Sequence, residues 1–230
     1  MTISAIWLFG SRARSQQTRG SDTDLLLVGG EDRTRHVSIG HLSMFFYAWE
    51  KLLEDARGGD LFTCHIVREA VPIYDPDGFL DKLSENFVLR RSYATEIQQA
   101  SDLGWFLDRY GSELRAALVA KRMIWCIRTI LIARSAEAGA PVFSPEALKQ
   151  LARSNSAREL LADRHQRHAD AAMRHKFRLF LKEEAMPLPL AGTLSMKQFE
   201  AHFHSTGNHV ALQAMRVGKH KDGDTSFYGS

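Results

Sequence analysis

The sequence predicts an α+β protein in which a small mixed-sheet domain is followed by an all-α helical bundle domain. Before residue 83, short β-prone runs alternate with turn residues, and after it apolar residues recur at three- and four-residue steps. Hydrophobic residues make up 44% of the chain and charged residues 25%, which is enough to bury a core. We therefore expect a first domain over residues 1–83, a helical bundle over 84–216 and a flexible tail over 217–230.

The first domain is expected to alternate strands with short helices. Turns such as Gly29-Gly30 close the β-prone runs, and Gly58-Gly59 ends a helix that precedes a second one capped by Asp60. The expected strands are Ile3–Phe9, Leu25–Val28, Ser43–Tyr47 and Val71–Tyr74, and the expected helices are Trp49–Arg57 and the segment from Asp60 through Glu69.

The second domain is expected to be helical. Apolar stripes predict two long helices, one over residues 93–110 and one over residues 114–131. The segment Phe143–Leu148 is a helix start, with Ser144 as N-cap, a proline in the first turn and two apolar ends that can pack together. A further helix is expected over about residues 157–182, a loop over 186–195 and a short helix over 197–215.

Charge and cysteine content exclude several classes of protein. The 30 Lys and Arg residues against 27 Asp and Glu residues give a net charge of +3, which argues against a polybasic nucleic-acid coat and an acidic tail. Cys64 and Cys126 lie far apart without zinc-ligand spacing, so neither a disulfide framework nor a structural metal is indicated. Apolar runs fall short of the roughly 18 residues that span a bilayer. We expect a soluble cytoplasmic protein with no membrane partner.

One stretch has the pattern of a phosphate-binding turn. An apolar strand ends at Phe9, and Gly10 permits a tight turn that brings backbone N–H groups close to an anion. Ser11 then opens a helix, whose unpaired N–H groups and positive dipole end favour phosphate. Arg12 and Arg14 follow, where each can neutralise phosphate charge or be a solvated surface residue. The stretch is suited to a polyphosphate.

Two carboxylates follow this turn. Asp22 and Asp24 begin the next expected strand, and because side chains alternate along a strand, both project from one face. Two carboxylates so close repel unless a cation lies between them, and Mg²⁺ is commonly held by one or two carboxylates together with substrate phosphates. The apolar run Leu25–Val28 would hold the pair rigidly. The alternative is a solvated strand entry beside a plain turn.

These residues resemble a known family. Gly10-Ser11 and Asp22-Thr23-Asp24 match, in order, spacing and context, the signature of minimal nucleotidyltransferases of the polymerase-β-like superfamily. The resemblance covers roughly the first 80 residues; the rest resembles, by architecture only, the helical domain of kanamycin-type nucleotidyltransferases or HEPN-like bundles. It implies that the turn and Arg14 bind a nucleoside triphosphate and that the two aspartates hold two Mg²⁺ ions.

The resemblance also implies a reaction. A nucleoside monophosphate, expected to be AMP from ATP, would pass to an acceptor hydroxyl on a protein or an RNA while pyrophosphate leaves. An aminoglycoside acceptor is disfavoured, because the helical half shows no array of acids to receive a polycation. Many family members of this size belong to toxin–antitoxin or anti-phage modules, so a partner toxin or defence protein is expected, and homo-oligomerisation stays open.

The third acidic residue of the family pattern is not found at its expected place. Family members usually carry it on the next strand of the sheet, where it can deprotonate the acceptor. In the expected strand over residues 42–47 that place holds Ser43 or its neighbours, none of them acidic. Asp60 could substitute if residues 61–67 formed a strand, although a helix N-cap is favoured. Two hypotheses follow: a two-carboxylate enzyme, or a catalytically weak or inactive nucleotide-binding regulatory subunit.

The helical half gives weaker candidates. The basic stretch Arg164–Arg178 can contact phosphate on an RNA or a nucleotide, or form a solvated helix face. Arg158 and His165 would share one helix face, a spacing loosely similar to that of HEPN-type ribonucleases, which makes RNA cleavage a third hypothesis. His165 and His168 could bind a metal, but no third ligand stands at a suitable spacing.

Two further histidines, His202 and His204, lie two apart in an otherwise ordinary segment. The sequence assigns them no role.

Overall fold

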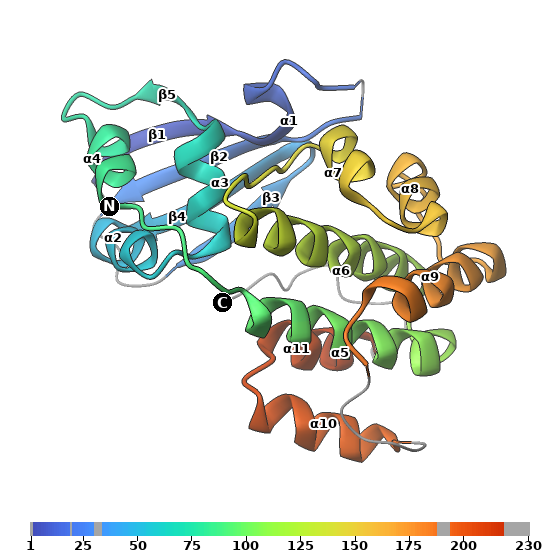
Figure 1. The fold of residues 1–230 in the computed structure, drawn as a ribbon. Helices are drawn as coiled ribbons and strands as arrows, with labels where there is room; N and C mark the ends of the chain where they lie inside the picture. The colour runs from blue at the N-terminus through green and yellow to red at the C-terminus, as the bar shows by residue number, and fades with distance from the viewer. Residues whose placement is uncertain (1, 19, 30–33, 188–193, 219–230) are drawn as a thin grey trace. The chain divides into compact units, whose positions relative to one another are not determined.

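The computed structural model describes residues 2–18, 20–29, 34–187 and 194–218. Two compact units divide between Arg90 and Arg91. Five strands lie in the first unit and the described part of the second is helical, which confirms the α+β class (Figure 1). The domain boundary expected after residue 83 falls inside α4 (Phe79–Asn86), a helix of the first unit, so the observed division lies seven residues later. The segment expected as a tail contributes residues 217 and 218 to the last helix, and its remainder lies outside the described residues.

A mixed sheet with the strand order β3-β4-β2-β1-β5 forms the first unit. β2 runs parallel to β4 and antiparallel to β1, while β3 and β5 are antiparallel edge strands. Four strands fall where the sequence predicts them, and β3 was missed. The strands are β1 (Ile3–Phe9), β2 (Thr23–Gly29), β3 (Arg35–Ile39), β4 (Leu42–Ala48) and β5 (Val71–Tyr74).

Helices α2 (Trp49–Arg57), α3 (Leu61–Glu69) and α4 cover one face of this sheet. Figure 1 shows the three helices in front of the strands. Their apolar side chains form one core with inward-facing residues of β1 and β2. α2 has the predicted bounds, whereas α4 was missed. The main members of the core are Trp7, Phe9, Leu26, Val28, Leu52, Ile66 and Leu83.

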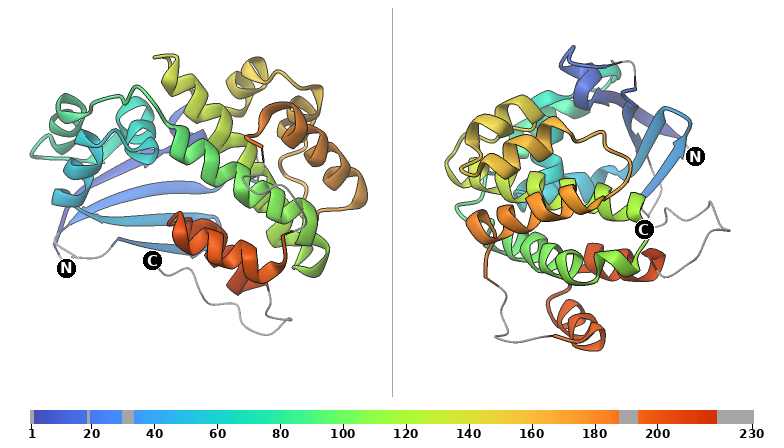
Figure 2. Two further views of the ribbon diagram at one scale, coloured as in Figure 1. Left: turned by 60° about the horizontal axis from the view of Figure 1, so that its bottom comes forward. Right: turned by 90° about the vertical axis from the view of Figure 1, so that its right-hand side faces the viewer.

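The second unit is centred on two long helices, α5 (Ala94–Tyr110) and α6 (Ala116–Glu137), joined by a short 3₁₀ turn. α7 (Pro145–Leu151) begins as predicted, with the Ser144 hydroxyl accepting a hydrogen bond from the N–H of Ala147. Figure 2 shows the yellow and orange helices α7 to α9 on one side of this pair and the red helices α10 and α11 on the other. None of the helices that the structure describes is long and apolar enough to cross a membrane.

Two predicted helices are in fact broken. The helix expected over residues 157–182 consists of α8 (Asn155–Ala162) and α9 (Ala171–Glu184), because Asp170 caps a new helix by accepting the N–H of Met173 at 2.7 Å. The helix expected over 197–215 consists of α10 (Met196–Ser205) and α11 (His209–Gly218), which separate at Gly207, whose φ is +63°. The loop expected over 186–195 lies mostly outside the described residues.

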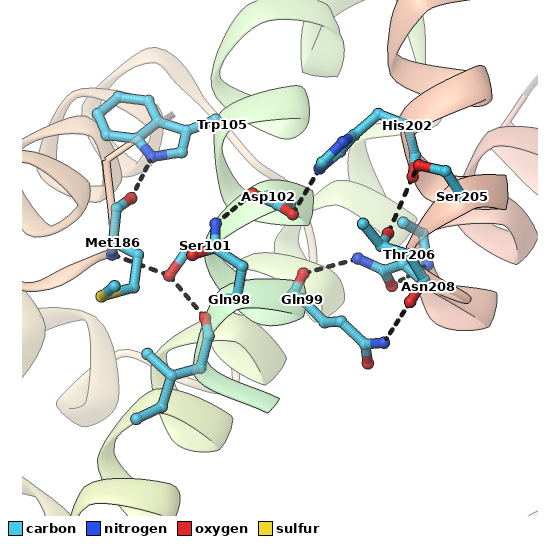
Figure 3. Close-up of polar contacts among 12 residues, drawn as sticks. Gln98, Gln99, Ser101, Asp102, Trp105, Met186, His202, Ser205, Thr206 and Asn208 are labelled. Carbon is cyan, nitrogen blue, oxygen red and sulfur yellow. Dashed lines mark hydrogen bonds and ion pairs between the residues drawn. The ribbon is translucent and has the colours of Figure 1, made fainter. Parts of the chain in front are cut away.

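Polar side chains of α5 form hydrogen bonds with Met186 and with residues of α10 and the turn after it (Figure 3). The fully buried carboxylate of Asp102 lies 2.7 Å from Nε2 of His202 and accepts the amide N–H of Gln98 at 2.7 Å. The Ser101 hydroxyl accepts the N–H of Met186 at 3.0 Å. His202, for which the sequence predicts no role, therefore contacts a buried carboxyl group and links α10 to α5.

Candidate functional site

The first feature of the candidate site is the turn at the end of β1. Gly10 has a φ of +75°, and a Cβ at this position would lie 2.6 Å from Oδ2 of Asp24. Asp24 is the partner of Phe9 in the β1–β2 ladder, so the turn and the carboxylate meet at the same end of the sheet. Glycine is required here both by the backbone conformation and by the space that the carboxylate occupies.

The helix that follows the turn is short. α1 (Gly10–Ala13) has four residues, and Ser11 lies in its single turn. A helix dipole of the kind expected from the sequence needs several aligned peptides, so its contribution here is small. Any anion bound at this turn would instead be held by the backbone N–H groups of the turn itself.

The two arginines of α1 and its C-cap have different partners. Arg12 donates from Nε to the carbonyl of Asp22 at 3.3 Å and from Nη2 to the carbonyl of Ser21 at 3.1 Å, which fixes the chain entering β2. Arg14 forms an ion pair through Nη1 with Glu69 of α3. Both arginines therefore stabilise the arrangement of the site as well as adding positive charge to it.

Glu69 is a carboxylate next to the site that no sequence motif indicates. Besides Arg14, it contacts Nε2 of His65 at 2.7 Å, one helical turn earlier in α3. Burial raises the pKa of Glu69, but the hydrogen bonds and charges of His65 and Arg14 outweigh it and hold the pKa below its ordinary value. Glu69 therefore favours its ionised form, in contact with Arg14 and His65.

Asp22 and Asp24 occupy different backbone environments. β2 begins at Thr23, so Asp22 lies just before the strand and not within it as expected. Its side chain is 58% exposed, and Oδ1 lies 3.2 Å from Nδ1 of His41 in the β3–β4 turn. The N–H of Thr23 donates to the carbonyl of His41 at 2.7 Å, which aligns this turn with the start of β2.

The strand position beside Asp24 carries a hydroxyl group. The parallel β2–β4 register pairs Asp24 with Ser43, which is buried. Oγ of Ser43 lies 2.7 Å from Nε2 of His36 on β3, and Oγ of Ser38 lies 3.2 Å from the same nitrogen. The His36 ring stacks on Phe45 with 4.2 Å between ring centroids. The sequence located Ser43 at this place, whereas His36 was missed together with its strand.

Asp60 does not take the place of a third strand carboxylate. It is the N-cap of α3, where Oδ1 accepts the backbone N–H of Thr63 at 2.8 Å. Residues 61–69 are helical, so the alternative in which residues 61–67 form a strand is wrong. The favoured interpretation of Asp60 as a helix cap is confirmed.

The arginine–histidine pair of the helical half is not on one helix face. α8 ends at Ala162, so His165 lies in the following turn, and Arg158 donates from Nη2 to the carbonyl of Ala152 at 2.7 Å. The expectation of a shared face is therefore wrong. Within the described ranges, no group of three or more His, Cys, Asp or Glu side chains could hold a metal, so His165 and His168 gain no third ligand there.

Comparison with protein families indicates a nucleotidyltransferase domain in the first unit. Residues 2–89 match the family model of the nucleotidyltransferase domain. No curated protein matches the chain. Among solved structures, the chain is similar to a nucleotidyltransferase-like protein from Exiguobacterium sibiricum 255-15, with 14% identity, coverage of 95% of this chain and 75% of that chain, and a TM-score of 0.35. The family match spans the turn and both aspartates, and it supports nucleotidyl transfer and a nucleotide substrate.

Proposed function

We propose that the first unit catalyses Mg²⁺-dependent transfer of a nucleoside monophosphate, AMP from ATP, to a hydroxyl on a protein or an RNA. The observation that carries the proposal is the approach of Asp24 to the Gly10 turn, in a segment that matches nucleotidyltransferase domains. A metal-bound triphosphate requires a phosphate-binding turn and a carboxylate at the same end of the sheet.

The residues present fit a magnesium ion. Asp24 offers an oxygen ligand beside the Gly10 turn, and Asp22 offers a second from its exposed position just before β2. Mg²⁺ takes oxygen ligands and usually binds one or two carboxylates plus phosphates and water, so a third protein ligand is not needed for binding. When bound, Mg²⁺ would neutralise the triphosphate and favour departure of pyrophosphate.

The chain's own groups would orient the nucleotide. The N–H groups of Gly10 and Ser11 are proposed to donate to the β- and γ-phosphates. Arg14 uses Nη1 for Glu69 and Nε for Gln16, so we assign Nη2 of its guanidinium to phosphate. Arg12 would act as a positioning residue, because it holds the backbone that carries Asp22.

A nucleotide-binding regulatory subunit is the second candidate. The position beside Asp24 holds Ser43, and Asp60 is used as a helix cap, so neither supplies the carboxylate that family members use to deprotonate the acceptor. Such a subunit would bind the nucleotide through the same turn and aspartates without transferring it. A toxin or defence protein as partner belongs to both candidates and rests on the family resemblance.

The test is incubation of the full chain with each NTP labelled at the α-phosphate, Mg²⁺ and a cell lysate. Label on protein or RNA supports the transferase, and calorimetric binding of Mg·ATP without label supports the regulatory subunit. Asp22→Asn with Asp24→Asn should eliminate transfer, whereas Asp60→Asn, which keeps a capping oxygen, should preserve it. Neither binding nor transfer with any NTP would overturn both candidates.

A further inference from the structure

The second unit contains a pocket whose lining is positively charged. It has a volume of about 490 Å³, is open to solvent, and lies between α6 and the loop that joins α8 to α9. We call it the basic pocket. Its α6 wall uses positions four and three residues apart, which share one helix face. The lining residues are Ala117, Lys121, Ile124, Arg164, Gln166, Arg167 and His168.

The loop that carries the charges is fixed in place. The N–H of Ala169 donates to the carbonyl of Ala116 at 3.1 Å, which ties the loop to the start of α6. Asp170 accepts the side-chain amide of Gln166 at 2.9 Å while capping α9. Arg174 donates from Nη1 to the carbonyl of Ala169 at 3.2 Å. The backbone of this loop is therefore already ordered before a ligand binds, so binding would lose little conformational entropy of the protein.

The positive charge of the basic stretch is concentrated at the pocket. In α9, Lys176 pairs with Glu159 at 2.8 Å and Arg178 pairs with Asp108 at 2.8 Å, so these charges are balanced. By contrast, Arg167 in the loop makes no ion pair within the part of the chain that the structure describes. The lining contains no carboxylate. Among the described residues, the loop half of the stretch thus carries Arg167 without a carboxylate partner, whereas Lys176 and Arg178 in the helix half are paired.

The chemistry of the lining favours phosphates on a flexible chain. Arg164 and Arg167 have planar guanidinium groups that match phosphate oxygens, and Lys121 lines the opposite wall. A pocket for a free nucleotide would enclose most of its ligand, whereas this one is open. Ala117 and Ile124 provide apolar surface that can contact ribose and base faces without selecting a base.

We propose that the basic pocket binds the phosphate backbone of single-stranded RNA. Binding would be independent of sequence, because phosphate contacts position a strand without reading its bases. The proposal does not depend on catalysis by the first unit.

The test measures binding of a fluorescent oligouridine to the full chain by anisotropy over a series of salt concentrations. Because each phosphate contact on a single strand contributes about 0.7 to the slope of log K against log salt, Arg164→Gln with Arg167→Gln should lower that slope by about 1.4 and weaken binding about twenty-fold at 0.1 M salt. The matched control is Lys176→Gln with Arg178→Gln, which removes the same two charges from α9 and should leave both quantities close to wild type.

Three results would overturn the proposal. The first is an affinity and salt slope that the loop variant leaves unchanged, and the second is an equal loss in the control, which would indicate net charge only. The third is tighter binding of tripolyphosphate or polyglutamate than of oligouridine at the same arginines, which would assign the pocket to a free polyphosphate or an acidic protein. The variant Asp22→Asn with Asp24→Asn should bind oligouridine normally, so failure of the transferase proposal is visible separately.

Discussion

The sharpest prediction concerns a single methyl group at Gly10. In Gly10→Ala the new Cβ would lie 2.6 Å from Oδ2 of Asp24, and the residue would keep a φ of +75°. A Cβ in a left-handed conformation costs about 1–2 kcal/mol. Moving the carboxylate off its rotamer costs about 0.5–1.5 kcal/mol more. We therefore expect the first unit to lose about 2–3 kcal/mol of unfolding free energy and Mg·ATP affinity to fall about tenfold or more, since tenfold corresponds to about 1.4 kcal/mol.

A matched control separates backbone strain from the clash with the carboxylate. Gly78 has φ +64° and ψ +40°, and a Cβ there meets nothing within 4 Å. Gly78→Ala should therefore cost about 1–2 kcal/mol and leave Mg·ATP affinity unchanged. Adding Asp24→Ala to Gly10→Ala removes the clash, so the double variant should be more stable than the sum of the single changes by about 1 kcal/mol.

Hydrogen exchange by mass spectrometry on peptides from β1 and β2 reports the stability of the first unit separately from the second. Calorimetry with Mg·ATP gives the affinity. If Gly10→Ala behaved like Gly78→Ala in both measurements, the carboxylate would not lie against the turn in solution, and the arrangement proposed for the site would be refuted.

Three further predictions test other groups. Asp60→Ala should cost about 1 kcal/mol through loss of the α3 cap and leave transfer intact; lost transfer with normal Mg·ATP binding would make Asp60 the third carboxylate. Asp102→Ala should destabilise the second unit by about 2 kcal/mol in urea unfolding, because it leaves the half-buried His202 and Gln98 without their shared hydrogen-bond partner; a loss below about 0.5 kcal/mol would contradict this. Because His65 and Arg14 lower the pKa of Glu69, its stabilising contribution is present at neutral pH and is lost as pH falls below the unfolded value of about 4.3 and through the folded pKa. Glu69→Gln should flatten unfolding free energy against pH over that range, and an unchanged profile would argue against the coupling.

Local signals predicted most of the fold. Strands closed by glycine or an Asp-Pro turn and the capped helix α3 fall where the sequence places them. β3 is a short, largely exposed edge strand in which only Val37 and Ile39 are apolar, so its apolar content is too low to stand out. The helix expected over residues 157–182 was wrong because apolar residues recur on both sides of a wholly polar segment, Asp163–His168. That segment, followed by a cap at Asp170, was a signal that could have divided the helix.

The candidate site was predictable only where its residues are neighbours in the sequence. Gly10 and Asp24 were found through a short motif, whereas His36 and Glu69 reach the site through β3 and α3, whose pairing no local pattern encodes.

The residue beside Asp24 on the neighbouring strand affects the rate that the site can reach. A missing general base costs about 10²–10⁴-fold in rate and leaves ligand binding intact. Ser43, which contacts His36, stands where a general base is expected. We therefore expect its presence to slow proton removal from the acceptor and to leave the affinity for Mg·ATP unchanged. A slow transfer that disappears with Asp22→Asn and Asp24→Asn would fit a two-carboxylate enzyme, and only binding without that residual rate would indicate the regulatory subunit.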